Sequence, residues 1–191
     1  MGKNSPDMRI CVFCGSSLGK DPAFQEQAEN LGRLFAELGI GLVYGGSDRG
    51  LMGKVSGACF EEGGEVLAIE PSFFLEWGAT TEKISRLIPT STMSERKQKM
   101  MELSDSFLAL PGGIGTLDEI SDVATCLGLG QAKGKLILFN LNHFYDPFLI
   151  LLKQYEEQGF LSPDWKGRPI VCNTFAEIKE ALEGLREEIH A

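Results

Sequence analysis

Short apolar runs alternate with longer segments of helical periodicity along the chain, and this alternation limits the folds that the chain can adopt. The apolar runs predict strands at residues 8–13, 40–44, 65–70, 86–90, 106–111, 135–140 and 169–173. The segments between them predict helices over 22–38, 51–62, 93–104, 116–128, 145–158 and 174–189. Because the strands are apolar throughout rather than at alternate positions, we expect a parallel sheet covered on both faces. The sequence therefore predicts a doubly wound α/β fold with about seven strands.

Length and charge narrow the class of protein. The 191 residues fit one domain, and we expect a single domain over 1–191. No apolar run approaches the roughly 20 residues that a membrane helix needs, and residues 1–10 lack the apolar core of a signal peptide. We therefore expect a cytoplasmic protein with no membrane partner. The formal net charge of -9 argues against a nucleic-acid partner, since phosphate backbones bind clustered lysine and arginine.

Cysteine and histidine offer little for metal or covalent chemistry. Cys11 and Cys14 form a C-x-x-C pair, but positions three apart on a strand point to opposite faces. We expect reduced thiols in the core rather than a redox or metal site. His143 and His190 are the two histidines of the sequence, which is too few for a multi-histidine zinc site. A Ser-His-Asp triad would have to use one of these two, which disfavours it.

Three predicted strands end in segments rich in glycine and hydroxyl groups. These segments are CGSS at 14–17, YGGSDRGLMG at 44–53 and PGGIGT at 111–116. Doubly wound sheets bind ligands beyond the carboxyl ends of their strands, so all three segments should meet at one edge. One glycine turn needs no ligand, but three at one edge favour a phosphate or sugar, with Ser16, Gly45 and Gly46 among its contacts.

The PGGIGT segment has the composition of a phosphate cradle. A helix N-terminus leaves unpaired N–H groups and positive dipole potential, and glycines let a phosphate oxygen approach them. Gly112, Gly113 and Gly115 give that access, and Thr116 adds a hydroxyl donor. The segment is not a dinucleotide fingerprint, because Asp118 stands where a third glycine would be required. It is not a Walker loop either, since no Gly-Lys-Ser/Thr follows.

Charged residues accompany this cradle. In MSERK, Arg96 and Lys97 lie in the first two turns of a predicted helix, where positive charge opposes the helix dipole. They either form a solvated face or meet a buried anionic ligand. Glu119 lies four residues past Gly115 and should reach whatever sits beside the phosphate, whereas the helix dipole alone accounts for Asp118.

The combination of PGGIGTLDE with an upstream MSERK resembles the LONELY GUY family of phosphoribohydrolases, whose hallmark is PGGxGTxxE after an ERK-type segment. CVFCGSS, LVYGGSDRGLMG, and LILFN followed by FYDPFL extend the resemblance over most of the chain. Members often carry the label "possible lysine decarboxylase". The resemblance implies a Rossmann-like fold, a homodimer, and hydrolysis of the N-glycosidic bond of a nucleoside 5'-monophosphate to base and ribose 5-phosphate. AMP and cytokinin riboside 5'-monophosphates are the typical substrates, and no cofactor or metal is implied.

The resemblance also implies roles for individual residues. Arg96 and Glu119 match the catalytic pair. The nucleotide-binding positions are matched by Lys97, Gly112, Gly113, Gly115, Thr116 and Thr125. These roles agree with the chemistry, because glycosidic cleavage builds oxocarbenium character on the ribose, which a carboxylate stabilises. Arg96 would bind the nucleotide and stabilise the charge that develops as the base departs.

Four departures from the family pattern surround the expected base pocket. The family patterns YGGG, VIGVIP and MHERK read YGGS, VLAIEP and MSERK in this chain, which introduces Ser47, Glu70 and Ser94. After Thr125 the family has a tryptophan and a glutamine, whereas this chain continues with Cys126. Hydrolysis of a nucleotide is therefore better supported than a cytokinin substrate. We expect the aromatic segment 72–80 to help line the same pocket.

Other functions remain open on the sequence alone. A non-catalytic nucleotide-binding or sensing module would use the same cradle, although retention of both Arg96 and Glu119 argues against it. A dehydrogenase is disfavoured by the missing third glycine. An amino-acid decarboxylase is disfavoured because no lysine is marked out for a Schiff base with a pyridoxal cofactor.

Overall fold

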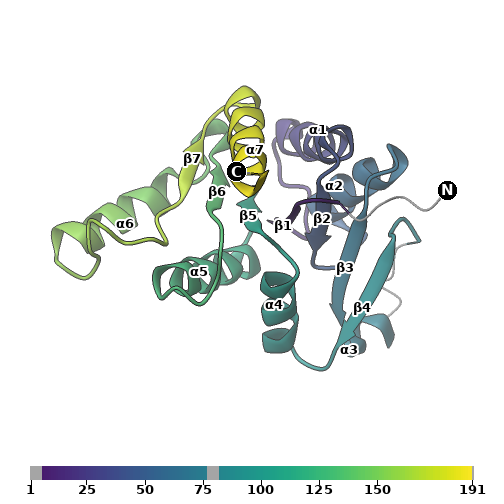
Figure 1. The fold of residues 1–191 in the computed structure, drawn as a ribbon, viewed down its shortest axis with the longest axis horizontal. Helices are drawn as coiled ribbons and strands as arrows, with labels where there is room; N and C mark the ends of the chain where they lie inside the picture. Colours follow the sequence, from purple (N-terminus) through teal and green to yellow (C-terminus); the bar gives the residue numbers. More distant parts are fainter. Residues whose placement is uncertain (1–5, 77–81, 191) are drawn as a thin grey trace.

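The computed structural model describes residues 6–76 and 82–190 and confirms the predicted α/β architecture. In this described part, seven parallel strands form one sheet in the order β4-β3-β2-β1-β5-β6-β7 (Figure 1). The strands are β1 (Arg9–Phe13), β2 (Gly41–Tyr44), β3 (Val66–Pro71), β4 (Arg86–Thr90), β5 (Ser106–Ala109), β6 (Leu136–Phe139) and β7 (Ile170–Cys172). Each lies within the range expected from its apolar run, except that β3 extends one residue past the predicted 65–70 to Pro71.

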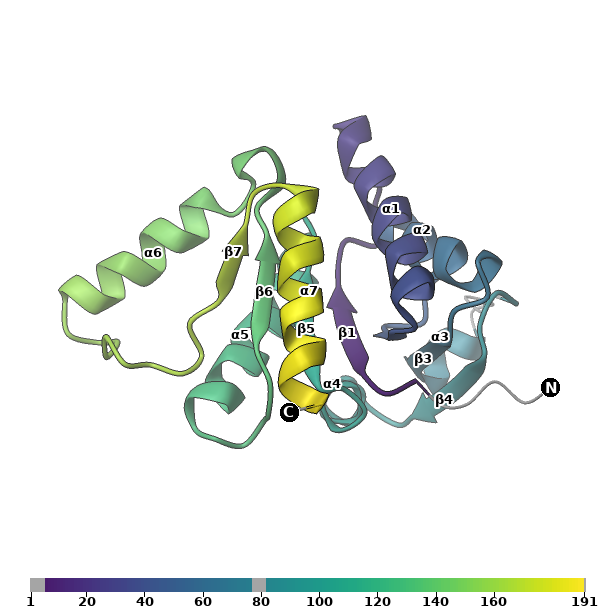
Figure 2. The ribbon, with the colours of Figure 1, turned by 45° about the horizontal axis from the view of Figure 1, so that its top comes forward.

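Helices cover both faces of the sheet, as the continuous apolar strands require. They are α1 (Pro22–Leu38), α2 (Gly50–Glu61), α3 (Ser72–Glu76), α4 (Met93–Glu102), α5 (Ile114–Gly128), α6 (Asp146–Glu157) and α7 (Phe175–His190), with a 3-10 turn η1 (Leu141–His143). One core joins the sheet to α1, α2 and α7, and a second core joins its other face to α4, α5 and α6. Figure 2 shows α7 lying across β5 and β6, with α1 and α2 over the other half of the sheet.

Local signals set both boundaries of α1. Asp21 caps α1 by accepting a hydrogen bond from the Ala23 backbone N–H at 2.9 Å, and Pro22 occupies the first helical position. Gly39 ends the helix in the left-handed conformation at φ 66°. The two elements that the sequence did not predict, α3 and η1, are five and three residues long. Such short segments carry too few turns for a helical period to be recognised.

The two cysteines of the C-x-x-C pair lie on opposite sides of the sheet, as expected. Cys11 belongs to the core beneath α4 and α5, whereas Cys14 belongs to the core beneath α1 and α7. Burial raises the pKa of both thiols above the ordinary value of 9.0. These cysteines therefore act as small apolar core residues.

The strand order fixes where a ligand site forms. From β1 the sheet extends through β2, β3 and β4 in one direction, and through β5, β6 and β7 in the other. The connections diverge at the β1–β5 junction, which opens a crevice at the carboxyl ends of the strands. None of the described helices has the length and apolar character needed to cross a bilayer.

Candidate active site

A pocket of about 700 Å³ lies at the carboxyl edge of the sheet, where the switch point predicts one. All three glycine-rich strand ends contribute to its wall, through Gly15 after β1, Gly45 after β2 and Gly113 after β5. Backbone hydrogen bonds join these loops. The Gly15 N–H donates to the Pro111 carbonyl at 3.1 Å, and the Leu51 N–H donates to the Gly15 carbonyl at 3.0 Å.

Two helix N-termini at the pocket, those of α2 and α5, have no side-chain cap. Gly113 precedes α5 in an extended conformation and provides no capping side chain, so the first N–H groups of α5 lack the partner a cap would give. A Cβ added to Gly113 or to Gly115 would meet no atom within 4 Å, so the space in front of these groups is open. At the N-terminus of α2, by contrast, the Leu51 N–H already donates a hydrogen bond to the Gly15 carbonyl. The α5 end is therefore the better anion site.

Gly112 and Thr116 pack closely together at the N-terminal end of α5. Thr116 is buried at 5% exposure and lines the pocket. A Cβ on Gly112 would collide with the Thr116 side chain and lie 2.9 Å from the Gly15 nitrogen. Gly112 thus allows two loops to pack closely and does not itself line the pocket.

Arg96 and Glu119 form a buried ion pair at the floor of the pocket. The Arg96 Nη1 donates to Glu119 Oε1 at 2.9 Å, and the two side chains are 8% and 11% exposed. Arg96 also donates from Nε to the Ile69 carbonyl at 3.2 Å and from Nη2 to the Gly45 carbonyl at 3.1 Å. Burial raises the pKa of Glu119 above 4.5, while the charge of Arg96 acts in the opposite direction.

Two glycines after β2 make room for charged side chains. A Cβ on Gly45 would collide with Nη2 of Arg96. Gly46 adopts φ 88°, and a Cβ there would lie 2.8 Å from Cβ of Glu70. Gly45 and Gly46, both predicted as ligand contacts, are therefore needed for a structural reason. Only glycine leaves room for the side chains of Arg96 and Glu70 to pack against the backbone here.

The structure brings most of the predicted site residues together. Those that line the pocket are Ser16, Gly45, Arg96, Gly113, Gly115, Thr116 and Glu119. Those that do not are Gly46, Lys97, Gly112 and Thr125. Phe74 lines the pocket as expected for the segment 72–80, of which residues 77–80 lie outside the described part.

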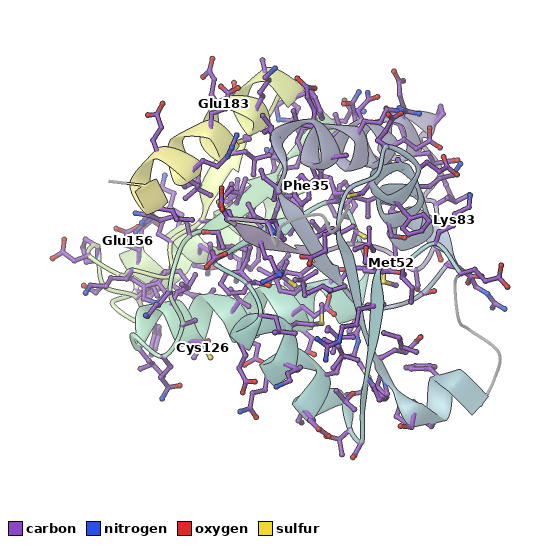
Figure 3. The ribbon with its side chains drawn as sticks, turned by 45° about the vertical axis from the view of Figure 1, so that its right-hand side comes forward. Phe35, Met52, Lys83, Cys126, Glu156 and Glu183 are labelled. Carbon is purple, nitrogen blue, oxygen red and sulfur yellow. The ribbon has the colours of Figure 1, made fainter. Side chains whose placement is uncertain are left out.

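Lys97 and Thr125 instead contact residues of α5. The Nζ of Lys97 lies 3.0 Å from Asp118 and 3.1 Å from Asp122, so its charge is balanced within the protein. The Thr125 hydroxyl donates to the Ser121 carbonyl at 2.8 Å. Cys126, the next residue, lies on α5 away from Met52 of the pocket (Figure 3). Because Arg96 is paired too, neither cation needs a ligand to explain its position on α4.

Several pocket residues were not predicted from the sequence. Met52, Met93 and Ile114 supply apolar surface, and Arg49 supplies a second cation. Arg49 immediately precedes α2, where a positive charge opposes the helix dipole, as Arg96 does on α4. The reasoning that singled out Arg96 would therefore have found Arg49.

A second hollow lies at the opposite edge of the sheet. It measures about 890 Å³ and includes Asp105 and Ser106 before and at the start of β5, and Gly134 before β6. Ligands of doubly wound sheets bind at the carboxyl edge rather than at this one. Within residues 6–76 and 82–190, no group of three His, Cys, Asp or Glu side chains is arranged to hold a metal ion.

Fold and site together define an α/β protein of the Rossmann-like class, with a pocket at the switch point that opens onto a helix N-terminus. Comparison with known proteins then identifies the family. A family model described as "Possible lysine decarboxylase" matches residues 52–182. The chain belongs to this family and is similar in sequence to LONELY GUY phosphoribohydrolases.

Two relatives illustrate the match. The cytokinin riboside 5'-monophosphate phosphoribohydrolase LOG of Oryza sativa subsp. japonica is 40% identical over 92% of this chain and 72% of its own length. A cytokinin riboside 5'-monophosphate phosphoribohydrolase of Arabidopsis thaliana is 42% identical over 94% of this chain and 81% of its own.

Solved structures share the fold at lower identity. The molybdenum cofactor carrier protein of Chlamydomonas reinhardtii superposes with a TM-score of 0.71 at 19% identity, covering 97% of this chain and 99% of its own. The molybdenum cofactor binding protein of Rippkaea orientalis gives 0.67 at 20% identity and covers all of both chains. At such identity the similarity shows the fold alone.

Proposed function

We propose that this protein hydrolyses the N-glycosidic bond of a nucleoside 5'-monophosphate, releasing the free base and ribose 5-phosphate. The observation that carries the proposal is the buried Arg96–Glu119 pair at the floor of a pocket that also contains the uncapped N-terminus of α5. The N-terminus of α5 suits a phosphate, and the Arg96–Glu119 pair suits the developing charge of a ribosyl cation. The named activity of relatives at about 40% identity supports the same reaction.

The phosphate is assigned to the end of α5. Its first N–H groups, the open space at Gly113 and Gly115, and the Thr116 hydroxyl suit an anion. Binding energy gained there would position the reacting bond over the ion pair. Ser16 and Arg49 line the same pocket and are proposed as additional contacts.

Glu119 is proposed as the carboxylate beside the anomeric carbon. In its ionised form it would stabilise the oxocarbenium character of the ribose and orient the attacking water. Arg96 would favour the ionised form of that carboxylate, since its guanidinium opposes the effect of burial, which raises the pKa of Glu119. Three Arg96 nitrogens donate to the protein, which fixes the guanidinium while leaving further N–H groups for the nucleotide.

The rival proposal is a nucleotide-binding module without turnover. It requires the same cradle but gives no reason to bury a carboxylate against an arginine beside it. A decarboxylase that uses a Schiff-base lysine is poorly supported, because no lysine is among the described residues that line the pocket.

Incubation with nucleoside 5'-monophosphates, including AMP and isopentenyladenosine monophosphate, tests the proposal by chromatography of the released base. We expect base from one or more nucleotides and none from the matching nucleosides, since these lack the phosphate. No release from any nucleotide, while nucleotides still raise the melting temperature, would establish the binding module instead.

Glu119→Gln tests the catalytic assignment. We expect kcat to fall by at least about 100-fold, because the amide cannot stabilise positive charge, with AMP binding retained. Glu102→Gln, the same change at an exposed position on α4, serves as the control and should behave as the parent protein. Loss of folding in Glu119→Gln, seen by circular dichroism, would make Glu119 a structural residue and contradict the assignment.

We further propose that the protein is a cytoplasmic homodimer in which each chain is a single domain. Large apolar side chains are exposed on α6 and the turn after it, with Ile150 at 67%, Tyr155 at 43% and Phe160 at 84%. Exposed apolar surface of this kind is typical of subunit interfaces. The cysteines are free, and four of the five are buried, which suits a reducing compartment.

A further inference from the structure

Glu70 is a buried carboxyl group at the carboxyl end of β3. Its side chain lines the active-site pocket, yet the residue is only 2% exposed. Its Oε2 atom has no hydrogen-bond partner among the described residues. A buried polar atom without a partner costs free energy, so a group that retains one commonly serves a ligand or a reaction.

The charged neighbours of Glu70 do not satisfy it. Arg96, from α4, directs its hydrogen bonds to Ile69, Gly45 and Glu119, and none to Glu70. Because Arg96 is already committed to Glu119, it cannot serve as a full counter-ion for a second carboxylate.

The remaining titratable neighbours, Asp48 and Tyr44, do not stabilise the ionised form of Glu70. Asp48, in the loop between β2 and α2, adds negative charge, and the phenol of Tyr44 on β2 is directed at the Gly46 carbonyl. Burial in the first place, and Asp48 in addition, raise the pKa of Glu70 to about 7, although Arg96 lowers it. Glu70 therefore holds its proton up to neutral pH.

The position of Glu70 matches the base end of a bound nucleotide. The phosphate cradle follows β5, and β2 and β1 lie between β5 and β3. Three strand spacings separate the two ends of the pocket by roughly 14 Å. Phe74 lines the pocket from α3, the helix that directly follows β3, and adds an aromatic surface of the kind on which a base stacks.

We propose that Glu70 is the general acid of the reaction, donating its carboxyl proton to a ring nitrogen of the departing base. The inference rests on the proposed phosphoribohydrolase function. As the C1'–N bond breaks, its electron pair goes to the base and the Glu70 Oε–H proton passes to a ring nitrogen. The water oxygen forms a bond to C1', and the proton that water loses returns to solvent, from which Glu70 is protonated again.

This assignment gives the two pocket carboxyl groups different roles. Glu119 is paired with Arg96 and acts as the anion beside the ribose, whereas Glu70 lacks a committed counter-ion and acts as the acid beside the base. Two carboxyl groups held in opposite protonation states by their surroundings are a recurring arrangement in glycosidic cleavage.

The test compares the parent protein with Glu70→Gln on two substrates. On AMP, which needs a proton on the leaving base, we expect kcat to fall by about 100-fold or more. On 4-nitrophenyl β-D-ribofuranoside 5-phosphate, whose nitrophenolate leaves without a proton, we expect a loss at least tenfold smaller. Equal losses on both substrates would overturn the assignment, because they would indicate general damage to the site.

The pH dependence of the parent protein provides a second measurement that does not depend on how the variant folds. We expect kcat/KM for AMP to fall as pH rises through about 7, as Glu70 loses its proton. A profile that stays level up to pH 9 would overturn the inference.

Controls separate this inference from the proposed function. Glu26→Gln, the same change at an exposed position on α1, should retain the parent profile on both substrates. If the parent protein releases base from no nucleotide, the proposed function fails and the inference falls with it. If the parent is active and Glu70→Gln equals it on AMP, only the inference fails.

Discussion

Three ionisable side chains, those of Arg96, Glu119 and Glu70, lie in the pocket and differ in their hydrogen-bond partners. Arg96 gives one hydrogen bond each to two backbone carbonyls and one to Glu119, so its charge is fixed in place. Glu119 has that partner, and Glu70 has none for its Oε2. The difference sets which carboxyl group is available as an acid and which as an anion.

Glu70 should also make the free energy of unfolding depend on pH. Its pKa is about 7 in the folded protein against an ordinary value of 4.5, so the folded state binds the proton more tightly than the unfolded chain does. The stability contributed by that proton is complete below pH 4.5 and is lost as pH rises through about 7. Glu70→Gln does not titrate, so we expect it to gain stability over the parent as pH rises.

Thermal unfolding at pH 5 and pH 8 measures this effect. We expect the difference in free energy of unfolding between Glu70→Gln and the parent to shift by roughly 2 kcal/mol in favour of the variant at pH 8, at about 1.4 kcal/mol per pKa unit. Glu26→Gln should follow the parent at both pH values. A Glu70→Gln difference that does not change with pH would show that the folded protein does not hold this proton.

At the scale of single elements, α5 combines two tasks at its first two turns. Its N-terminus lacks a side-chain cap and faces open space, and Glu119 projects from the second turn towards Arg96. The helix begins at Ile114, two residues before the predicted start at 116, because the extended Gly113 acts as its cap residue. Gly115 and Thr116 therefore lie in the first turn, where their N–H groups are free for an anion.

Gly115→Ala tests whether an anion occupies this space. The added methyl meets no atom of the protein, so we expect folding stability to be retained. The methyl would stand where a phosphate oxygen approaches, so AMP affinity measured by calorimetry should fall by about tenfold or more.

Gly184→Ala on α7 is the matched control for that variant. Gly184 also has no atom within 4 Å of an added Cβ and lies in the middle of a helix. We expect the alanine to raise stability by about 0.5–1 kcal/mol and to leave AMP affinity unchanged. If Gly115→Ala binds AMP as the parent does, the phosphate is not held at this end of α5.

At the scale of the whole molecule, exposed apolar side chains on α6 predict self-association. Ile150 is 67% exposed on this helix, so Ile150→Asp should place a charge in the proposed interface. We expect light scattering after gel filtration to give a dimer for the parent and a monomer for the variant, with Lys153→Ala on the same helix remaining dimeric. A parent protein that is monomeric at micromolar concentration would contradict the proposed homodimer.

Much of this architecture follows from short-range features of the sequence. Continuous apolar runs predict a sheet covered on both faces, and Asp21, Pro22 and Gly39 mark the ends of α1. Because parallel strands share one carboxyl edge, the three glycine-rich segments were expected to converge there, and they do. The five-residue helix α3 was not predicted, since its sequence pattern is too short to distinguish from that of a loop.

Side-chain partners were less predictable. Arg96 and Lys97 are adjacent in sequence and were both assigned to the nucleotide, but neighbours on a helix point in directions about 100° apart. Arg96 lines the pocket and pairs with Glu119, whereas Lys97 pairs with Asp118 and Asp122 of α5 and does not line the pocket. Which of the two enters the site depends on how α4 packs against the sheet and α5.

The sequence by itself determined the alternation of strands and helices, the edge at which the loops meet and several of the groups gathered there. These follow from hydrophobic periodicity, capping and glycine, which act within a few residues of one another. Only the tertiary structure decided that Arg96 pairs with Glu119, that Lys97 and Thr125 lie outside the pocket and that Glu70 stays buried without a full counter-ion. The physical reason is that charge pairing and desolvation depend on distances between elements far apart in the chain, which packing sets.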